Sequence, residues 1–341
     1  MKATIKDIAK LSGVGIATVS RVLNGSGAAS KEAKERVMDA VRELNYIPNS
    51  NARNLKLGQS RTILLLAKSI INPFFQKMIY VIERQISLRG YSLEIKNVSH
   101  MEEEMIVAQR EAQNGNLCGI IIMGGRYGYK EEDFKRLRIP CVLVTITADE
   151  SVGKELYSSV IIDDQKESRK AVESLIKMGH RRIGCIYNNY GSLVTPNYYR
   201  LQGYKQALEE NDIRYDPGLV STINVMESGY EFGFKIMKNI LEQNRDMSAV
   251  IAMADVMAIG AAKAVLSSGL RIPEDISVMG FDGIEEAEYY NPALDSVGQP
   301  AQQMAQQAVD AMMEMIGSGT TSQIVLETNI VRRGSCAKVN R

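Results

Sequence analysis

The sequence predicts an α/β protein with a small helix-turn-helix head, followed by a body of two doubly wound parallel sheets. Three observations predict this fold. The 341 residues are about twice the ~150 expected of one domain. Two short amphipathic segments separated by a glycine begin the chain, and strand-like apolar runs alternate with helical patterns after residue 61. Hydrophobic residues make up 45% and charged residues 24%, which excludes a mostly disordered chain.

The first 61 residues are basic. They contain eleven Lys and Arg against five Asp and Glu, whereas the other 280 residues contain 30 and 35. A basic segment joined to a slightly acidic body favours contact between that segment and a polyanion such as nucleic acid. A solvated surface of mixed charge would give the same counts, so charge alone leaves both interpretations open.

Composition also narrows the classes of function. The four cysteines are scattered without a CxxC pair, and two lie in strand-like runs, which predicts reduced thiols in a cytoplasmic protein. No apolar signal segment begins the chain, and the longest apolar run is far shorter than the ~18 residues of a membrane span. Two histidines exclude a His-rich metal site, so neither a metal nor a cofactor is expected.

Catalytic motifs are missing from the sequence. It has no GxxxxGK followed by Ser or Thr, no GxGxxG, no GxSxG and no HExxH. Residues 174–177 have the form SxxK but lie in an amphipathic stretch without the accompanying motifs, so chance explains them. We therefore expect that the chain is not an enzyme.

The head has the capping signals of three helices. Thr4 to Asp7 fits a capping box, Gly13 would end that first helix, and a second is predicted from Ile16 to Leu23. Ser30 would cap a third, bracing helix. This is a helix-turn-helix pattern, whose second helix lies in the major groove. Arg21 on its outward face would read guanine, a contact worth ~1–3 kcal/mol. The alternative is a three-helix bundle that binds a protein or has no partner, since its helices would have the same spacing in the sequence.

A connector follows the head. In the segment 46–58, Asn49 or Asn51 can cap a short helix through Leu57, which Gly58 would stop. The segment has too few apolar residues to be stable as an isolated helix. We therefore expect a linker that becomes helical only when something holds it.

Several motifs of the head and connector belong together. They are TIKDIA at 4–9, GV at 13–14, ATVSRVLN at 17–24, LNYIPN at 44–49 and ARNL at 52–55. Together they resemble the LacI/GalR family of bacterial transcription regulators. The resemblance implies a cytoplasmic homodimeric repressor that binds palindromic double-stranded operator DNA, with Leu55 of paired hinge helices wedged into the minor groove. The positions implied to contact DNA are Thr4, Gly15, Ile16, Ala17, Thr18, Ser20, Arg21, Asn24, Tyr46, Asn49, Ala52, Leu55 and Lys56.

The body alternates apolar runs with amphipathic stretches. The runs begin at residues 63, 118, 141, 160, 183, 249 and 276. Continuous apolar strands alternating with helices imply parallel sheets covered on both faces, and the length suits two sheets with a break near Asp163. The resemblance implies the periplasmic-binding-protein type I plan, with ligand in the cleft between the halves. The expected ranges are 1–48 for the head, 49–61 for the hinge, 62–162 with 291–320 for the first half, and 163–290 with 321–341 for the second.

The resemblance also implies which residues meet a small-molecule effector in that cleft. A guanidinium at Arg200 suits a carboxylate, a phosphate or a vicinal diol. Asp282 at a strand end would accept bonds from sugar or nucleoside hydroxyls, although surface salt bridges are the alternative for both residues. Asp163 fits a helix cap as well. The complete expected set is Asn72, Phe74, Phe75, Thr145, Asp163, Arg200, Asn224, Asp282 and Gln299.

Three positions depart from the family pattern. Thr145 stands where many relatives have aspartate, Asn224 where many have a stacking aromatic, and Ala254 where sugar-binding members have asparagine. A small polar ligand, such as a sugar or related metabolite, remains the expectation. A corepressor base, a phosphorylated metabolite or a protein partner stays open, as does the direction of the switch. An architectural DNA-binding protein is a further alternative, which has little use for such a body.

Overall fold

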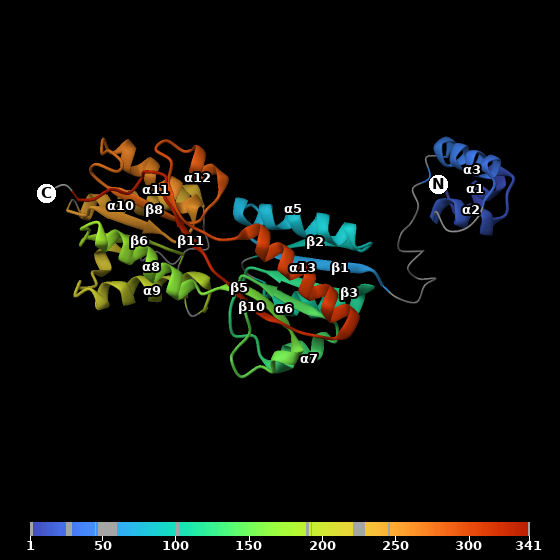
Figure 1. Cartoon of the computed structure of the whole chain (residues 1–341), viewed down its shortest axis with the longest axis horizontal. Coiled ribbons are helices and arrows are strands. Elements are labelled where there is room, and N and C mark those ends of the chain that lie inside the picture. The colour runs from blue at the N-terminus through green and yellow to red at the C-terminus, as the bar shows by residue number, and fades with distance from the viewer. Residues whose placement is uncertain are drawn as a thin grey trace. The chain divides into compact units, whose positions relative to one another are not determined.

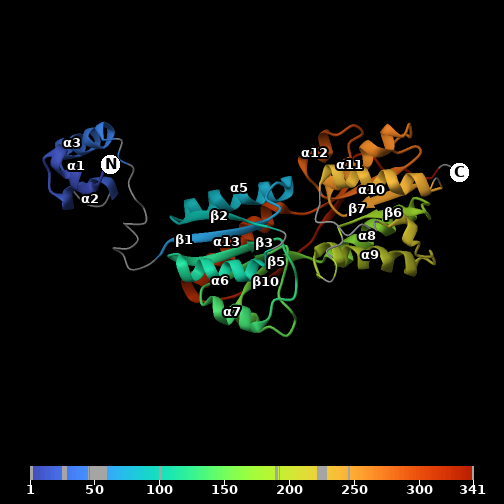
Figure 2. The same cartoon turned by 180° about the vertical axis from the view of Figure 1, so that it is seen from behind.

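The computed structural model describes residues 3–24, 29–44, 46, 60–99, 102–188, 191, 193–220, 229–244 and 246–339. The chain divides into one compact unit up to Ser60 and a second from Arg61 onward (Figures 1 and 2). Within the described ranges, no helix has both the length and the apolar character needed to cross a membrane.

The first unit contains α1 (Ile5–Ser12), α2 (Ile16–Asn24) and α3 (Lys31–Glu43). The carboxylate of Asp7 accepts hydrogen bonds from the backbone N–H and the hydroxyl of Thr4, at 2.8 and 2.7 Å. Gly13 ends α1 at a φ of 69°, and Ser30 caps α3. The core is formed by Ile8, Val19, Val37 and Ala40, one or two from each helix. The predicted three-helix head is therefore confirmed.

The first half of the body is a six-stranded parallel sheet in the order β10-β5-β4-β3-β1-β2. Residues of β1 alternate between two cores: Ile63 and Leu65 contribute to one, Leu64 and Leu66 to the other. Because both faces are covered, the strand is apolar throughout. The strands are β1 (Thr62–Lys68), β2 (Ser92–Val98), β3 (Leu117–Met123), β4 (Cys141–Val144), β5 (Ser158–Ile162) and β10 (Gln323–Leu326).

Helices cover both faces of this sheet. The helices α5 (Pro73–Leu88) and α13 (Ala301–Ser318) lie side by side on one face, although more than 200 residues separate them along the chain (Figure 1). The other face carries α6 (Glu104–Asn114) and α7 (Glu131–Leu137). The predicted doubly wound arrangement is confirmed for this half.

The second half is a five-stranded sheet in the order β11-β9-β8-β7-β6. All neighbours are parallel except β11, which pairs antiparallel with β9. The strands are β6 (Ile183–Ile186), β7 (Ala249–Ala252), β8 (Ser277–Asp282), β9 (Asp295–Gly298) and β11 (Asn329–Val331). The helices are α8 (Asp164–Lys177), α9 (Pro196–Glu210), α10 (Tyr230–Gln243), α11 (Asp255–Ser267) and α12 (Glu285–Tyr289). Two short 3-10 turns lie at Lys154–Leu156 and Pro217–Leu219.

The positions at which the chain passes between the halves differ from expectation at two places. The first passage follows β5, next to Asp163, as the sequence predicts. The second follows β9, at Gln299, and the third follows β10, rather than residues 290 and 320. The expected ranges 291–320 and 321–341 are therefore corrected, since β9 belongs to the second sheet and β10 to the first. A local pattern can predict a strand but not the sheet that the strand joins, so pairing with neighbouring strands decides the place of both.

Helix pairs in the second half pack with their backbones close together. A Cβ added at Gly260 of α11 would lie 1.9 Å from the carbonyl oxygen of Tyr230 in α10. One added at Gly233 of α10 would lie 2.1 Å from that of Met257. The two glycines thus allow the backbones of α10 and α11 to approach each other closely.

We predict that Gly260→Ala lowers the free energy of unfolding of the body by about 3 kcal/mol, because a backbone carbonyl cannot move aside. Gly317→Ala is the matched control, since Gly317 in α13 has no atom within 4 Å of its Cβ position. That variant should gain about 0.5–1 kcal/mol from helix propensity. Urea unfolding measures the stability of both variants. A Gly260→Ala protein that is as stable as the Gly317→Ala protein would refute the close packing.

Candidate functional site

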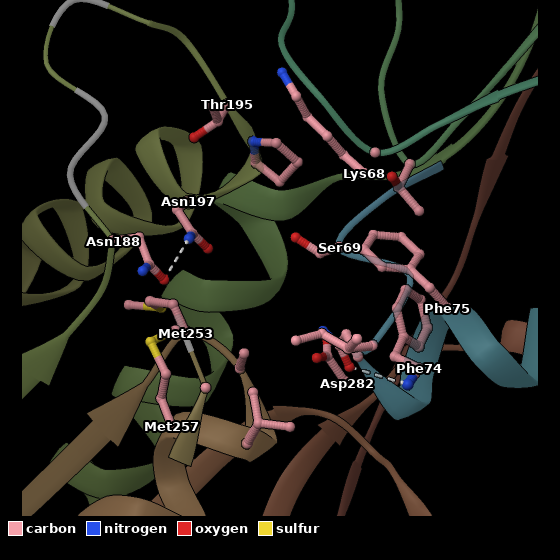
Figure 3. A pocket seen from close by; sticks show the side chains of 18 of the residues that line it. Lys68, Ser69, Phe74, Phe75, Asn188, Thr195, Asn197, Met253, Met257 and Asp282 are labelled. Atoms are coloured by element: carbon pink, nitrogen blue, oxygen red, sulfur yellow. Dashed lines mark hydrogen bonds between the residues drawn. The ribbon is translucent and has the colours of Figure 1, made fainter. Parts of the chain in front are cut away.

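A cavity of about 450 Å³ lies between the two halves of the body, where the strands of both sheets end. Lys68 ends β1, Asp282 ends β8, and Thr145 directly follows β4. Carboxyl ends of parallel strands are where such folds bind ligands. Figure 3 shows Phe74 and Phe75 on one side of the cavity and Asn188, Asn197, Met253 and Met257 on the other.

Arg200 of α9 is the buried cation of the cavity, with 6% of its surface exposed. Its Nε donates to Asp164 Oδ1 at 2.7 Å, and its Nη1 donates to the carbonyl oxygen of Met253 at 2.6 Å. Asp282 Oδ1 lies 3.6 Å from Nη1, and the guanidinium carbon lies 3.7 Å from the centre of the Phe281 ring. Two carboxyl groups therefore lie beside one guanidinium inside the protein.

Asp282 is the carboxyl group most affected by this environment. Burial raises its pKa from 3.8 to about 7, an increase that Arg200 opposes and the nearby Asp255 reinforces. Gln299 Nε2 donates to Asp282 Oδ1 at 2.8 Å, and the backbone of Gln299 also donates to the carbonyl oxygen of Asp282. Near neutral pH this carboxyl group can accept hydrogen bonds when ionised and donate one when protonated.

A second buried aspartate, Asp255, shapes the loop after β8. Its Oδ2 accepts from the backbone N–H groups of Gly283 and Ile284 at 2.7 and 2.8 Å, and its Oδ1 accepts from the Ser296 hydroxyl at 2.6 Å. Burial raises the pKa of Asp255, and these hydrogen bonds oppose the rise. Asp255 thus holds the chain directly after Asp282.

The first half contributes apolar side chains and two cations, Lys68 and Arg126, each paired with a glutamate; Arg126 Nη2 donates to Glu103 Oε2 at 2.7 Å. Phe74 and Phe75 begin α5, with Asn72 capping that helix through a 3.0 Å bond to the Phe74 N–H. Lys68 forms an ion pair with the buried Glu104. The hydroxyl oxygen of Thr145 is buried, and the described atoms offer it no hydrogen-bond partner.

Backbone conformation marks two of these residues. Asp282 has a φ of 121° and Thr145 a φ of 67°, both in the region that favours glycine. Such strained residues cluster at ligand sites because the surrounding structure holds them there.

Most of the expected cleft residues come together, with three exceptions. Asp163 does not line the cavity: it is exposed, and its side chain accepts the Lys166 N–H at 3.0 Å, so the helix-cap alternative describes it. Gln299 is buried behind Asp282 and contacts the cavity through it. Asn224 lies outside the described residues. Asn72, Phe74, Phe75, Thr145, Arg200 and Asp282 all line the cavity, and their roles in binding remain predictions.

Several cavity residues escaped the sequence-based prediction. The buried partner of Arg200 is Asp164, directly after the expected Asp163, and neither spacing nor composition separates the two. Asn188, Thr195 and Asn197 come from loops and a helix start that carry no motif. The signal that could have favoured Asp164 is its phase within the predicted helix, because it stands seven and eleven residues before Ala171 and Leu175 on the buried face of α8.

In the head, several of the residues predicted to contact DNA are exposed on α2. Ile16, with 44% of its surface exposed, Ala17 and Arg21 face solvent on α2, and Gly15 before them is also exposed. Thr18, Ser20 and Tyr46 are half-buried, and Thr4 caps α1. The side chain of Asn24 and the residues Asn49, Ala52, Leu55 and Lys56 lie outside the described part of the chain. Contacts of all these residues with DNA remain predictions.

Comparisons with known proteins agree with this architecture. Residues 4–49 match the family described as bacterial regulatory proteins, lacI family, and residues 172–336 match a periplasmic binding protein-like domain. The chain is 36% identical to the HTH-type transcriptional regulator MalR of Clostridium butyricum, over 98% of this chain and 99% of that protein. It is 34% identical to the ribose operon repressor of Haemophilus influenzae, over 98% of each. A solved structure of the transcriptional regulator CelR in complex with cellobiose has a TM-score of 0.69 at 29% identity, covering 98% of this chain and 100% of that one.

A helix-turn-helix head joined to a two-lobed, periplasmic-binding-protein-like body defines a transcriptional regulator. The chain belongs to the LacI family of bacterial regulatory proteins.

The pKa of Asp282 predicts a pH dependence of stability. Its pKa is about 7 in the folded protein and near 3.8 in the unfolded chain, so the folded state binds more protons between these values. The stabilising contribution of the protonated carboxyl is complete below about pH 4 and is lost as the pH rises through about 7.

Asp282→Asn removes this contribution. Urea unfolding at about pH 5 and about pH 8 should show a smaller loss of stability with rising pH in the variant than in the wild type. Asp246→Asn, at an aspartate whose side chain is 69% exposed, should follow the wild type. The same pH response in wild type and Asp282→Asn would contradict the assignment.

Proposed function

We propose that this regulator binds a palindromic operator as a homodimer, and that a neutral, hydroxyl-rich small molecule in the cleft switches its affinity for DNA. The observation that carries this proposal is the buried arrangement of Arg200 with Asp164 and Asp282 in the cavity wall. The relatives named above support a saccharide, since one of them was solved with cellobiose.

The charges of the cavity favour a neutral effector over an anionic one. Arg200 already contacts two carboxylates and a backbone carbonyl. The other two cations that line the cavity are also paired, Lys68 with Glu104 and Arg126 with Glu103. An incoming phosphate or carboxylate would have to displace an existing partner of one of these cations. Hydroxyl groups, in contrast, can donate to Asp282 and bond the hydroxyl of Thr145 without adding charge.

The proposal of a homodimer has two supports. A single helix-turn-helix contacts too few base pairs for operator specificity, so two heads on a two-fold site are required. The first half of the body also exposes apolar side chains around the free edge of β2. They are Tyr80 and Leu88 on α5, Ile95 on β2 and Ile106 on α6, between 43% and 72% exposed. A second copy of the chain could cover this face.

We further propose that the protein acts by binding rather than by catalysis, and in the cytoplasm where its DNA lies. None of the described residues that line the cavity is a histidine or a cysteine. Both ring nitrogens of His180 have hydrogen-bond partners away from the cavity. Nδ1 lies 2.9 Å from the Ser248 hydroxyl, and Nε2 lies 3.0 Å from the carbonyl oxygen of Ala337.

Arg21→Ala tests the DNA-reading helix. On the palindrome that the wild-type protein selects from random duplexes, affinity should fall at least tenfold because a base contact is lost, while binding to a scrambled duplex changes little. Arg42→Ala is the control, since Arg42 on α3 pairs with Asp39 at the surface. Fluorescence anisotropy at fixed salt measures all four affinities, and wild-type protein that binds both duplexes equally well would refute sequence-specific recognition.

A panel of small molecules tests the effector. Ribose, maltose and cellobiose represent neutral hydroxylated ligands, with adenine and glucose 6-phosphate as contrasting probes. A neutral sugar at about 100 times its dissociation constant should stabilise the protein by about 2.7 kcal/mol and alter operator affinity. Asp282→Ala should lose this response and keep operator binding. Asp163→Ala, which removes only a helix cap, should keep both. A response limited to the phosphorylated probe, or an undiminished response of Asp282→Ala, would contradict the proposal.

A further inference from the structure

We propose that Tyr127 is a positioning residue of the effector cleft: reaching from the first half to the second, it orients Asp164 and thereby Arg200, so that effector binding depends on how the halves are held together. The inference rests on the proposed effector cleft. It concerns a residue that does not line the cavity itself.

Tyr127 contacts the second half through three different groups. It lies in the loop after β3, in the first half. Its backbone N–H donates to the carbonyl oxygen of Val194 at 2.8 Å. Its hydroxyl donates to Asp164 Oδ2 at 3.3 Å, and its ring lies 4.9 Å from that of Tyr199, at 71°. All three partners belong to the second half, so the contacts act across the cleft.

The hydroxyl of Tyr127 is suited to this contact. Burial raises its pKa well above the usual 10, and the negative charge of Asp164 adds to the rise, so the hydroxyl stays protonated and remains a donor. It also lies 3.5 Å from the carbonyl oxygen of Thr145, in its own half. The bond to the Asp164 carboxylate is shorter and assisted by charge, so the closed arrangement is favoured over one in which the hydroxyl donates only to the carbonyl of Thr145.

Asp164 transmits the contact to the cavity. Its two oxygens are divided between Tyr127 and Arg200, at 3.3 and 2.7 Å. Arg200 in turn lies beside Asp282, and Asp282 accepts from Gln299. Asp164 directly follows the first passage of the chain between the halves, and Gln299 lies at the second. A continuous row of polar contacts thus joins Tyr127, the cavity and both passages.

The test separates the hydroxyl from the ring. Tyr127→Phe removes the bond to Asp164 and keeps the ring contact and the backbone bond. Tyr157→Phe is the matched control, because the Tyr157 hydroxyl lies 3.2 Å from that of Thr147 within the first half. Asp164→Asn, alone and combined with Tyr127→Phe, completes a double-mutant cycle.

Spin labels attached at Glu132→Cys on α7 and Glu209→Cys on α9 measure how far apart the two halves are. Both positions are exposed, and the measurement uses the full-length chain without effector. Burial raises the pKa of Cys118 to about 11, which limits labelling of that native thiol, and the parent chain serves as the blank. Tyr127→Phe should increase about fivefold the ratio of molecules with the longer label distance to molecules with the shorter one, as expected for the loss of one net hydrogen bond. Tyr157→Phe should leave the ratio unchanged.

The cycle decides the mechanism. In the Asp164→Asn background, Tyr127→Phe should have little further effect, since the partner of its hydroxyl is already altered. Two outcomes overturn the inference. One is the same population ratio in Tyr127→Phe as in Tyr157→Phe, and the other is an about fivefold effect of Tyr127→Phe that persists in the Asp164→Asn background. These distances need no effector, so failure here leaves the response to ribose, maltose and cellobiose intact. Failure of that panel would refute the proposed function and leave the distances standing.

Discussion

The cleft depends on the burial of one positive charge. Removing the guanidinium of Arg200 from water is costly unless carboxylates and hydrogen-bond acceptors surround it. Asp164, the carbonyl oxygen of Met253 and Asp282 do so, each from a different segment of the second half. Burial raises the pKa of Asp282 to about 7 although Arg200 lowers it, so the second carboxyl group beside Arg200 is only partly ionised near neutral pH.

This arrangement explains why the cavity combines polar atoms with limited net charge. Arg200 donates hydrogen bonds to Asp164 and to the carbonyl oxygen of Met253. Lys68 is paired with Glu104 and Arg126 with Glu103. The polar groups that line the cavity also include the carboxyl group of Asp282, the amides of Asn188 and Asn197, and the hydroxyl of Thr145, which has no hydrogen-bond partner among the described atoms. A ligand rich in hydroxyl groups complements such a surface, whereas an added anion would compete with it.

The same contacts connect the cavity with the segments that join the halves. Asp164 and Gln299 stand where the chain passes from one sheet to the other, and both contact the Arg200–Asp282 pair directly. An effector that changes the hydrogen bonds of Asp282 would therefore act on groups next to the segments that join the two halves of the body. In a family whose head reads DNA, such a change can alter the equilibrium between two arrangements of the body.

Local sequence determined much of this protein. Capping residues such as Thr4, Gly13 and Ser30 set the helices of the head, and buried runs such as Ile63–Ala67 set the strands, because both signals act within a few residues. Family motifs pointed to Arg200 and Asp282. Tertiary structure alone decided the sheets to which β9 and β10 belong, since a local pattern does not say which neighbours a strand pairs with. It also decided that Asp164 rather than Asp163 faces Arg200, and that Tyr127 reaches the other half, because these contacts join residues from separate segments of the chain.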